Sequence, residues 1–208
     1  MKLFLASSLC EMKTQLLAYT WALEWKKIAC CLNPVDKRIE KEWAIPQWVL
    51  EDITMLENLW VELIPLDLRK WDSHIKQIVE SVDWVFVCWW ETQYLLQTAR
   101  ENDFPKLLNE FLHDPNHFYC STSAWSCRIW SHIREYDEKE EVIDVVPWEN
   151  RLPCMIIPHR SRDTPWSRNR YLWTAIEKVY NAGCATLCIT DNQAIIFDWN
   201  TFTIIHNV

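Results

Sequence analysis

Residues 118–130 read FYCSTSAWSCRIW, and this stretch decides how the fold is interpreted. An apolar run leads into a small polar turn around Ser123, and the residues that follow are able to begin a helix. A strand that passes into a helix through such a turn exposes a serine hydroxyl beside free backbone N–H groups, which stabilise an oxyanion. Ser123 is therefore our candidate nucleophile. A turn of the G-x-S-x-G kind needs glycine on both sides, whereas this chain has Ser121 and Trp125.

Strand-like and helix-like segments alternate along the rest of the chain. We expect strands at 2–6, 28–32, 61–66, 83–88, 117–121, 154–158 and 185–190, and helices at 12–25, 46–59, 73–82, 92–100, 104–112, 168–181 and briefly from Cys127. Residues 36–41 form a loop or short helix, 134–141 a charged loop, and 194–198 with 201–205 a hairpin. The pattern predicts an α/β fold over residues 1–208, a single domain. Its doubly wound, mostly parallel sheet has helices on both faces and a C-terminal β-hairpin.

Composition excludes several classes of function. The chain has 208 residues and a formal charge of -8, without a cluster of Lys and Arg. Nucleic acids and anionic membranes are bound through such clusters, so we expect neither as a partner. The longest uninterrupted apolar stretch, residues 84–90, is far shorter than the ~18 residues that span a bilayer. The N-terminal apolar segment is too short for a secretion signal, and we expect a soluble cytoplasmic protein, either monomer or homodimer.

The nine cysteines agree with a cytoplasmic location. Their number is odd and most lie in apolar runs, which is typical of buried thiols in a reducing compartment. The sequence contains neither a C-x-x-C pair nor an H-E-x-x-H motif. We therefore expect no metal site and no cofactor.

A serine nucleophile needs a base, and a histidine at a neighbouring strand end usually supplies it. His159 follows the strand predicted at 154–158, so it is our candidate base. His132, which is close to Ser123 in sequence, is the second choice.

The acid that orients the base is expected between Ser123 and His159. The chain offers Asp137, Glu138 and Asp144 there, and Asp137 is the first choice. A solvated run of charges explains these residues equally well.

Several segments, taken in chain order, resemble the peptidase E family of aspartyl dipeptidases, which has a class I glutamine-amidotransferase-like fold. The matching segments are KLFLASS at 2–8, VFV at 85–87, T-x-Y-L-L at 92–96, STSAWS at 121–126, IPH at 157–159 and TDNQAIIFD at 190–198. They span nearly the whole chain. Their combination is specific, although each segment alone is not.

The resemblance implies a serine peptidase that hydrolyses small peptides, with dipeptides carrying an N-terminal aspartate as expected substrates. Ser123 would attack the peptide carbonyl, and His159 would act as base and then as acid. An acidic residue near Asp137 would orient the histidine.

The resemblance also assigns an oxyanion hole and a substrate pocket. Backbone N–H groups at Trp89, Trp90 and Ala124 would hold the oxyanion. Thr92 and Asn192 are candidate substrate-binding residues, although a role for Asn192 in shaping a turn is the simpler interpretation.

The chain departs from the family pattern at positions where the family has glycine. It has 15 tryptophans and one glycine, where a chain of this length has about 15 glycines. Tryptophan stands where relatives have glycine at positions 25, 60, 89, 90, 125, 130 and 199. One hypothesis is that the gene uses a genetic code in which a codon translated here as tryptophan means glycine.

Two further functions stay open if the tryptophans are genuine. The indoles at 89, 90 and 125 would fill the pocket, so the chain would be a catalytically inactive relative. An amidotransferase-like protein needs a cysteine nucleophile, but Cys120 and Cys127 lie several residues from the serine position.

Overall fold

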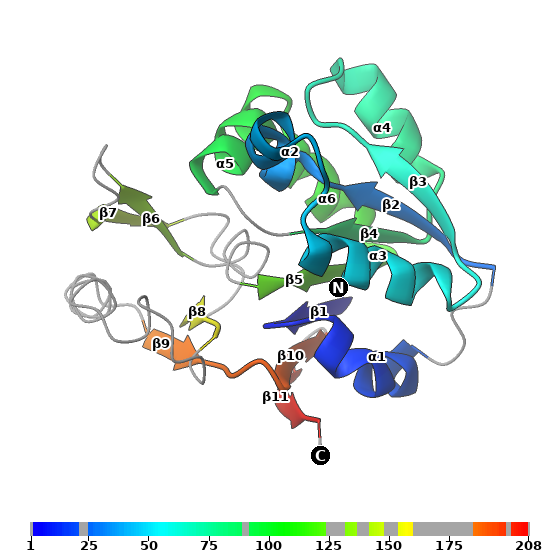
Figure 1. Cartoon of the computed structure of the whole chain (residues 1–208), viewed down its shortest axis with the longest axis vertical. Coiled ribbons are helices and arrows are strands. Elements are labelled where there is room, and N and C mark those ends of the chain that lie inside the picture. The colour runs from blue at the N-terminus through cyan, green and yellow to red at the C-terminus, as the bar shows by residue number, and fades with distance from the viewer. Residues whose placement is uncertain are drawn as a thin grey trace.

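The computed structural model describes residues 2–20, 25–88, 92–123, 132–136, 142–147, 154–159, 185–198 and 201–207. A seven-stranded sheet with strand order β11-β10-β1-β5-β4-β2-β3 forms its centre (Figure 1). The strands of this sheet are β1 (Lys2–Ala6), β2 (Lys27–Cys31), β3 (Glu62–Leu66), β4 (Trp84–Val87), β5 (Phe118–Thr122), β10 (Gln193–Asp198) and β11 (Thr201–His206). The helices are α1 (Lys13–Thr20), α2 (Asp36–Glu42), α3 (Gln47–Glu57), α4 (Asp72–Glu80), α5 (Thr92–Glu101) and α6 (Phe104–Phe111), with short 3-10 turns η1 (Cys10–Met12) and η2 (Asn33–Val35).

Strand direction in this sheet is mostly parallel. β1 and β5 pair in parallel, as do β5 with β4, β4 with β2, and β2 with β3. β10 runs antiparallel to β1 and forms a hairpin with β11. The α/β fold predicted from the alternating segments is confirmed, including its C-terminal hairpin.

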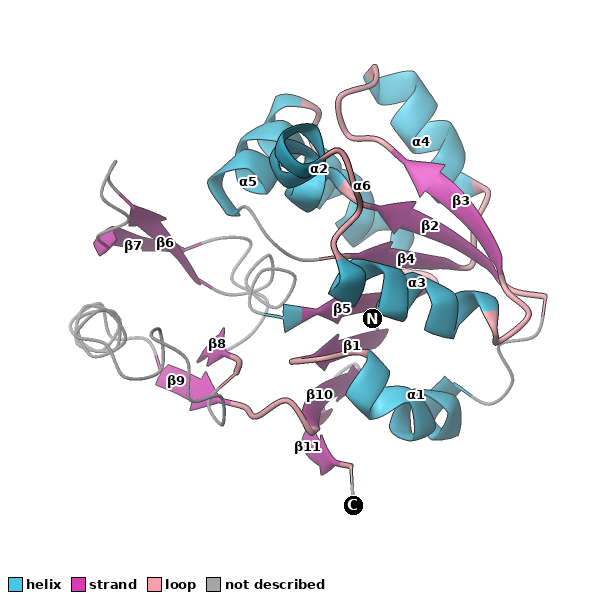
Figure 2. Ribbon diagram, in the orientation of Figure 1, coloured by secondary structure: helices cyan, strands magenta, loops and turns pink. Residues whose placement is uncertain are grey.

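The central strands bury both faces because their apolar side chains alternate. Leu3 and Leu5 of β1 belong to a buried cluster with side chains of α4, α5 and α6. Phe4 and Ala6 of the same strand point to the other face, where they pack with side chains of α1 and α3. The helices therefore cover the sheet from both sides (Figure 2). Each large apolar side chain buried in this way contributes about 1.5–3 kcal/mol.

Two parts of the chain differ from the sequence prediction. Residues 134–136 were expected in a charged loop, but they belong to β6 (His132–Tyr136), which pairs antiparallel with β7 (Val142–Pro147). The charge of these residues did not predict their secondary structure, because the hydrogen bonds between paired strands are made by the backbone. A two-stranded antiparallel pair therefore accepts charged side chains. β8 (Cys154–Ile157) and β9 (Ala185–Cys188) form their own parallel pair and do not join the main sheet. The helices predicted from Cys127 and at 168–181 lie outside the described residues.

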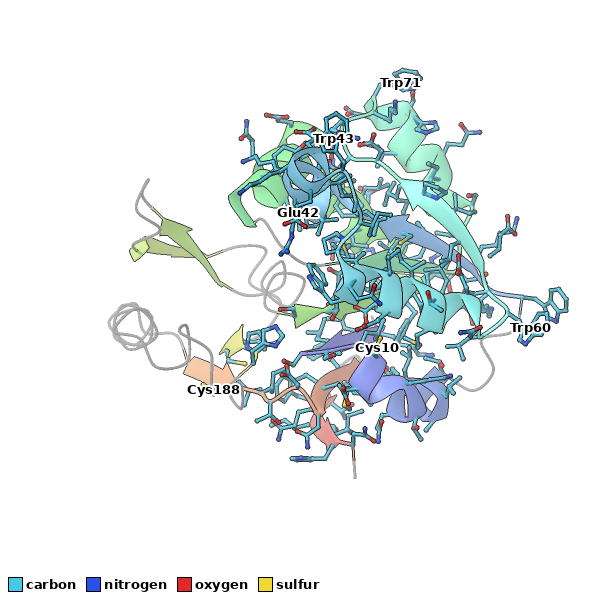
Figure 3. The ribbon with its side chains drawn as sticks, viewed as in Figure 1. Cys10, Glu42, Trp43, Trp60, Trp71 and Cys188 are labelled. Atoms are coloured by element: carbon cyan, nitrogen blue, oxygen red, sulfur yellow. The ribbon has the colours of Figure 1, made fainter. Side chains whose placement is uncertain are left out.

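Three tryptophans adopt a backbone conformation that favours glycine. Trp25, Trp43 and Trp60 have φ angles of 69°, 54° and 60°. Their side chains are 82%, 91% and 71% exposed, and Trp60 projects away from the body of the molecule (Figure 3). A residue with a β-carbon in this conformation costs about 1–2 kcal/mol, and no burial of the indole offsets that cost. The geometry supports the hypothesis that these codons mean glycine.

Trp43 offers a direct test of that strain, because it ends α2 and its N–H donates to the Ile39 carbonyl, as a helix-terminating glycine does. Trp43→Gly is expected to unfold with a free energy about 1 kcal/mol higher than Trp43→Ala, which keeps the β-carbon. Urea denaturation measures both variants. Equal stability of the two would show that the backbone at this position is unstrained.

Candidate functional site

Ser123 directly follows β5, and its backbone is strained. Its φ angle is 62°, in the left-handed region that is unfavourable for a residue with a β-carbon. β5 lies between β1 and β4 in the sheet, so the serine sits at the carboxyl edge of central parallel strands. This is where doubly wound folds place their ligands.

His159 comes to the same edge from a different part of the chain. It follows β8 and Pro158, and its φ angle of 57° is also in the left-handed region. Its Nε2 atom is 2.6 Å from the Ser123 hydroxyl oxygen. The structure thus brings together the two side chains that the sequence analysis singled out as nucleophile and base.

The second ring nitrogen of His159 has a carboxylate partner. Nδ1 is 2.5 Å from Asp191 Oδ1, and the two side chains are each 19% exposed. This bond assigns the ring proton to Nδ1, which leaves Nε2 to accept from the serine hydroxyl. Asp137, the acid chosen from the sequence, lies outside the described residues, and so does Glu138.

The direction of β10 explains why Asp191 lies at this edge. Asp191 belongs to the turn that precedes β10, and β10 runs antiparallel to β1 with Ala194 opposite Ala6. The start of an antiparallel strand lies beside the end of its parallel neighbours. The sequence analysis missed Asp191 because it looked for the acid only between Ser123 and His159.

The other candidate residues have different positions. Asn192 is exposed in the turn before β10, and its Oδ1 accepts a 2.5 Å bond from the Thr190 hydroxyl, which fits a turn-shaping role. Thr92 is the first residue of α5. His132, the second choice for the base, begins β6, and Asp144 lies within β7. Trp89, Trp90 and Ala124 lie outside the described residues.

A buried carboxyl group lies under the nucleophile strand. Asp52 of α3 is only 4% exposed, and its Oδ1 accepts bonds of 3.1 Å from both the N–H and the thiol of Cys10. Thr122, the residue before Ser123, also bonds to Asp52. Burial raises the pKa of the Asp52 carboxyl to about 6, although the bonds from Cys10 and Thr122 partly oppose this.

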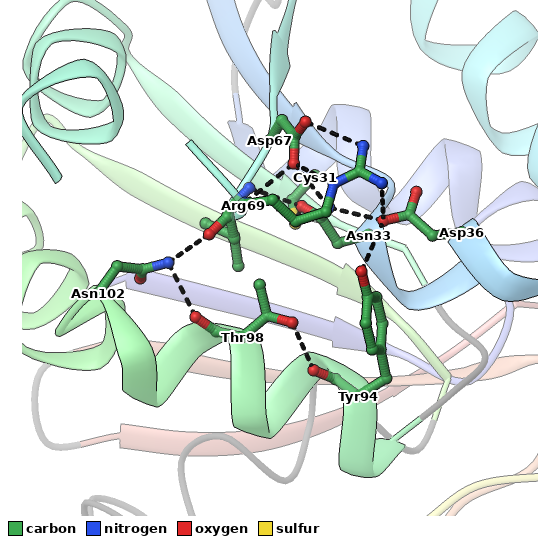
Figure 4. Close-up of polar contacts among 9 residues, drawn as sticks. Cys31, Asn33, Asp36, Asp67, Arg69, Tyr94, Thr98 and Asn102 are labelled. Carbon is green, nitrogen blue, oxygen red and sulfur yellow. Dashed lines mark hydrogen bonds and ion pairs between the residues drawn. The ribbon is translucent and has the colours of Figure 1, made fainter. Parts of the chain in front are cut away.

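A second polar cluster joins the loops after β2 and β3 (Figure 4). The Asn33 amide donates to Asp36 and Asp67, and its carbonyl accepts from the Leu68 N–H. The Arg69 guanidinium bonds to Asp67 and Asp36, and the Asp67 bond holds the pKa of that carboxyl well below its usual range. These groups edge a cavity of about 370 Å³. Because these groups bond to one another, the cluster holds the loop after β2 and the loop after β3 together.

Among the residues that the structure describes, His, Cys, Asp and Glu side chains form no group of three or more that could hold a metal ion. In the same part of the chain, the helices lack the length and apolar character required to cross a bilayer.

The structure of the whole chain is similar to solved structures of other proteins. No protein-family model matches the chain, and no curated protein has a significantly similar sequence. The structure is similar to that of a "Putative Peptidase E Protein" from Listeria monocytogenes EGD-e, with a TM-score of 0.79 and 19% identity over 99% of this chain and 98% of that chain. It is also similar to a peptidase from an acI-B1 Actinobacterium, with a TM-score of 0.72 and 14% identity over 99% of this chain and 87% of that one. At these identities the likeness shows a shared fold.

Asp52 gives the stability of the protein a predictable pH dependence. Its folded pKa of about 6 lies above the ordinary value of 3.8, so between these values the folded chain holds a proton that the unfolded chain has lost. The contribution of Asp52 to the free energy of unfolding is therefore greatest at low pH, and it decreases as the pH rises from 3.8 to about 6. The loss amounts to about 3 kcal/mol.

The matched variant is Asp52→Asn, which cannot titrate. Between about pH 4 and pH 7 the unfolding free energy of the wild type should fall by about 3 kcal/mol relative to that of this variant. Parallel pH profiles for the two proteins, measured by urea denaturation, would contradict the raised pKa.

Proposed function

We propose that this protein is a serine peptidase of the peptidase E type, with Ser123 as nucleophile, His159 as base and Asp191 as the acid that orients the base. The observation that carries the proposal is the 2.6 Å contact between Ser123 Oγ and His159 Nε2 at a strained turn. The shared fold of the two peptidase structures supports it. The Asp191 bond to His159 Nδ1 supplies the third member of the triad.

The first half of the reaction forms an acyl-enzyme. His159 Nε2 takes the proton of the Ser123 hydroxyl while Oγ attacks the peptide carbonyl carbon, and the carbonyl oxygen becomes an oxyanion. His159 then carries a positive charge, which the Asp191 carboxylate stabilises through Nδ1. When the tetrahedral intermediate collapses, the C–N bond breaks and His159 gives its proton to the leaving amine.

The second half uses the same groups with water. His159 takes a proton from a water molecule, whose oxygen attacks the acyl carbon. The bond to Ser123 Oγ breaks, and the serine recovers its proton from His159. The backbone N–H groups of residues 89, 90 and 124 are proposed to hold the oxyanion in both halves.

We propose dipeptides with an N-terminal aspartate as substrates, on the basis of the family resemblance. A cationic side chain must then face the aspartate carboxylate. Arg128, Arg160 and Arg162 are the candidates from sequence, and all three lie outside the described residues.

A second candidate function is that of a catalytically inactive relative. The tryptophans written at positions 89, 90 and 125 favour it, because indoles there would fill the pocket. The left-handed backbone at Trp25, Trp43 and Trp60 favours the active enzyme instead. It supports the hypothesis that these tryptophan codons mean glycine, and glycine at 89, 90 and 125 would leave the pocket open. The amidotransferase alternative loses support, because Cys120 lies buried within β5 before the turn.

Peptide mass spectrometry of the protein from its native source separates these two candidates. Glycine is expected at positions 25, 43, 60, 89, 90, 125, 130 and 199, because one reassigned codon would affect all of them. Peptides that carry intact tryptophan at 89, 90 and 125 would remove the translation hypothesis and favour an inactive protein.

Reaction with a fluorophosphonate probe tests the proposed nucleophile. The protein with glycine at these eight positions should be labelled, and Ser123→Ala should abolish labelling. His159→Ala should prevent both labelling and turnover of Asp-Leu dipeptide, and Asp191→Asn should lower kcat by about 10⁴-fold. Ser73→Ala, on the exposed surface of α4, is the control. Undiminished labelling of Ser123→Ala would refute the assignment.

A further inference from the structure

A serine at the end of β1 contacts both of the residues that accompany the nucleophile. Ser7 follows β1 directly and is 1% exposed. Its hydroxyl donates to Asp191 Oδ1 at 2.9 Å and accepts from the backbone N–H of His159 at 3.0 Å. The same oxygen is 3.3 Å from His159 Nδ1. One small side chain therefore connects two segments that lie far apart in sequence.

The bond to the backbone of His159 acts on a strained residue. His159 has a φ angle of 57°, and the preceding residue, Pro158, has no N–H to help anchor the turn. A residue in the left-handed region persists only where the surrounding structure holds it there. The Ser7 hydroxyl supplies one of the bonds that hold it.

The bond to Asp191 acts on the orientation of the carboxylate. Oδ1 accepts from both the Ser7 hydroxyl and the ring N–H of His159, so two donors fix the same oxygen. The ring proton follows the 2.5 Å bond to Asp191 and not the 3.3 Å contact with Ser7. Ser7 is thus a donor to the acid, and it does not compete with the acid for the imidazole.

Ser7 itself is held in place by the sheet. Its backbone N–H donates to the Gln193 carbonyl at 3.3 Å, and Ala6 pairs with Thr122 on one side and Ala194 on the other. The serine therefore lies between the strand that leads to Ser123 and the strand that follows Asp191. A side chain on such a frame is well suited to set the geometry of its neighbours.

We propose that Ser7 is a positioning residue for the Ser123–His159–Asp191 triad, a fourth member that fixes the imidazole through the backbone of His159 and through the carboxylate of Asp191. The inference rests on the proposed function. Ser7 acts through the orientation of the base, since it bonds to His159 and Asp191. Its loss is therefore expected to affect the chemical step and not substrate binding.

Three variants of the glycine-containing protein test the role of Ser7 in turnover of Asp-Leu dipeptide. Ser7→Ala should lower kcat by about 10- to 100-fold with KM nearly unchanged, because two hydrogen bonds that fix the imidazole are lost. Ser7→Thr keeps the hydroxyl and should recover most of that loss. Ser8→Ala, the neighbouring serine, should behave as wild type. A Ser7→Ala enzyme that keeps full kcat, or one whose defect lies in KM alone, would overturn the proposal.

A spectroscopic measurement tests the same role without requiring turnover. The Nδ1 proton of His159, shared with a carboxylate at 2.5 Å, should give a far-downfield proton resonance, which His159→Gln removes. Ser7→Ala should shift or broaden this resonance, while Ser8→Ala should leave it in place. An unmoved resonance in folded Ser7→Ala would refute the positioning role. Absence of labelling and turnover in the glycine-containing protein with Ser7 and Ser8 unchanged would refute the proposed function instead, so the two failures are distinguishable.

Discussion

The imidazole of His159 is the element on which the rest of the site depends. Its two nitrogens join a serine from β5 to an aspartate from the turn before β10, at 2.6 Å and 2.5 Å. Neither partner is near His159 in sequence. The geometry exists because the main sheet brings Ser123 and Asp191 to one edge, and the residues after β8, a strand of the separate β8–β9 pair, bring His159 beside them. β1 fixes the relative positions of Ser123 and Asp191, since it pairs in parallel with β5, which ends before Ser123, and antiparallel with β10, which begins after Asp191.

The positive φ angles at Ser123 and His159 have a different cause from those at the three tryptophans. At Ser123 and His159 the strained backbone carries side chains that contact each other, and neighbouring bonds hold the strain. At Trp25, Trp43 and Trp60 the indoles are exposed and gain nothing that would offset the strain. The first pattern is typical of a functional site, and the second is typical of glycine positions. This contrast links the backbone geometry to the shortage of glycine in the composition.

The fold was predictable from sequence to a large extent, because strand and helix periods alternate clearly from Lys2 to Thr122 and again in the C-terminal hairpin. The prediction failed at residues 134–136, where charge suggested a loop and backbone pairing made a strand. Ser123 and His159 were recognisable because each follows an apolar run at a strand end. Asp191 and Ser7 were not, because their importance depends on which strands are neighbours, and residue spacing along the chain does not encode that order. The hairpin at 194–205 was foreseen, but its position beside β1 was not.

A crystal structure of the protein after reaction with a serine-directed phosphonate tests this account most directly. The account predicts a covalent bond from phosphorus to Ser123 Oγ, with His159 Nε2 still within hydrogen-bond distance of the adduct and Asp191 still bonded to Nδ1. A phosphonate attached to another residue, or an adduct at Ser123 with His159 turned away from it, would contradict the central claim.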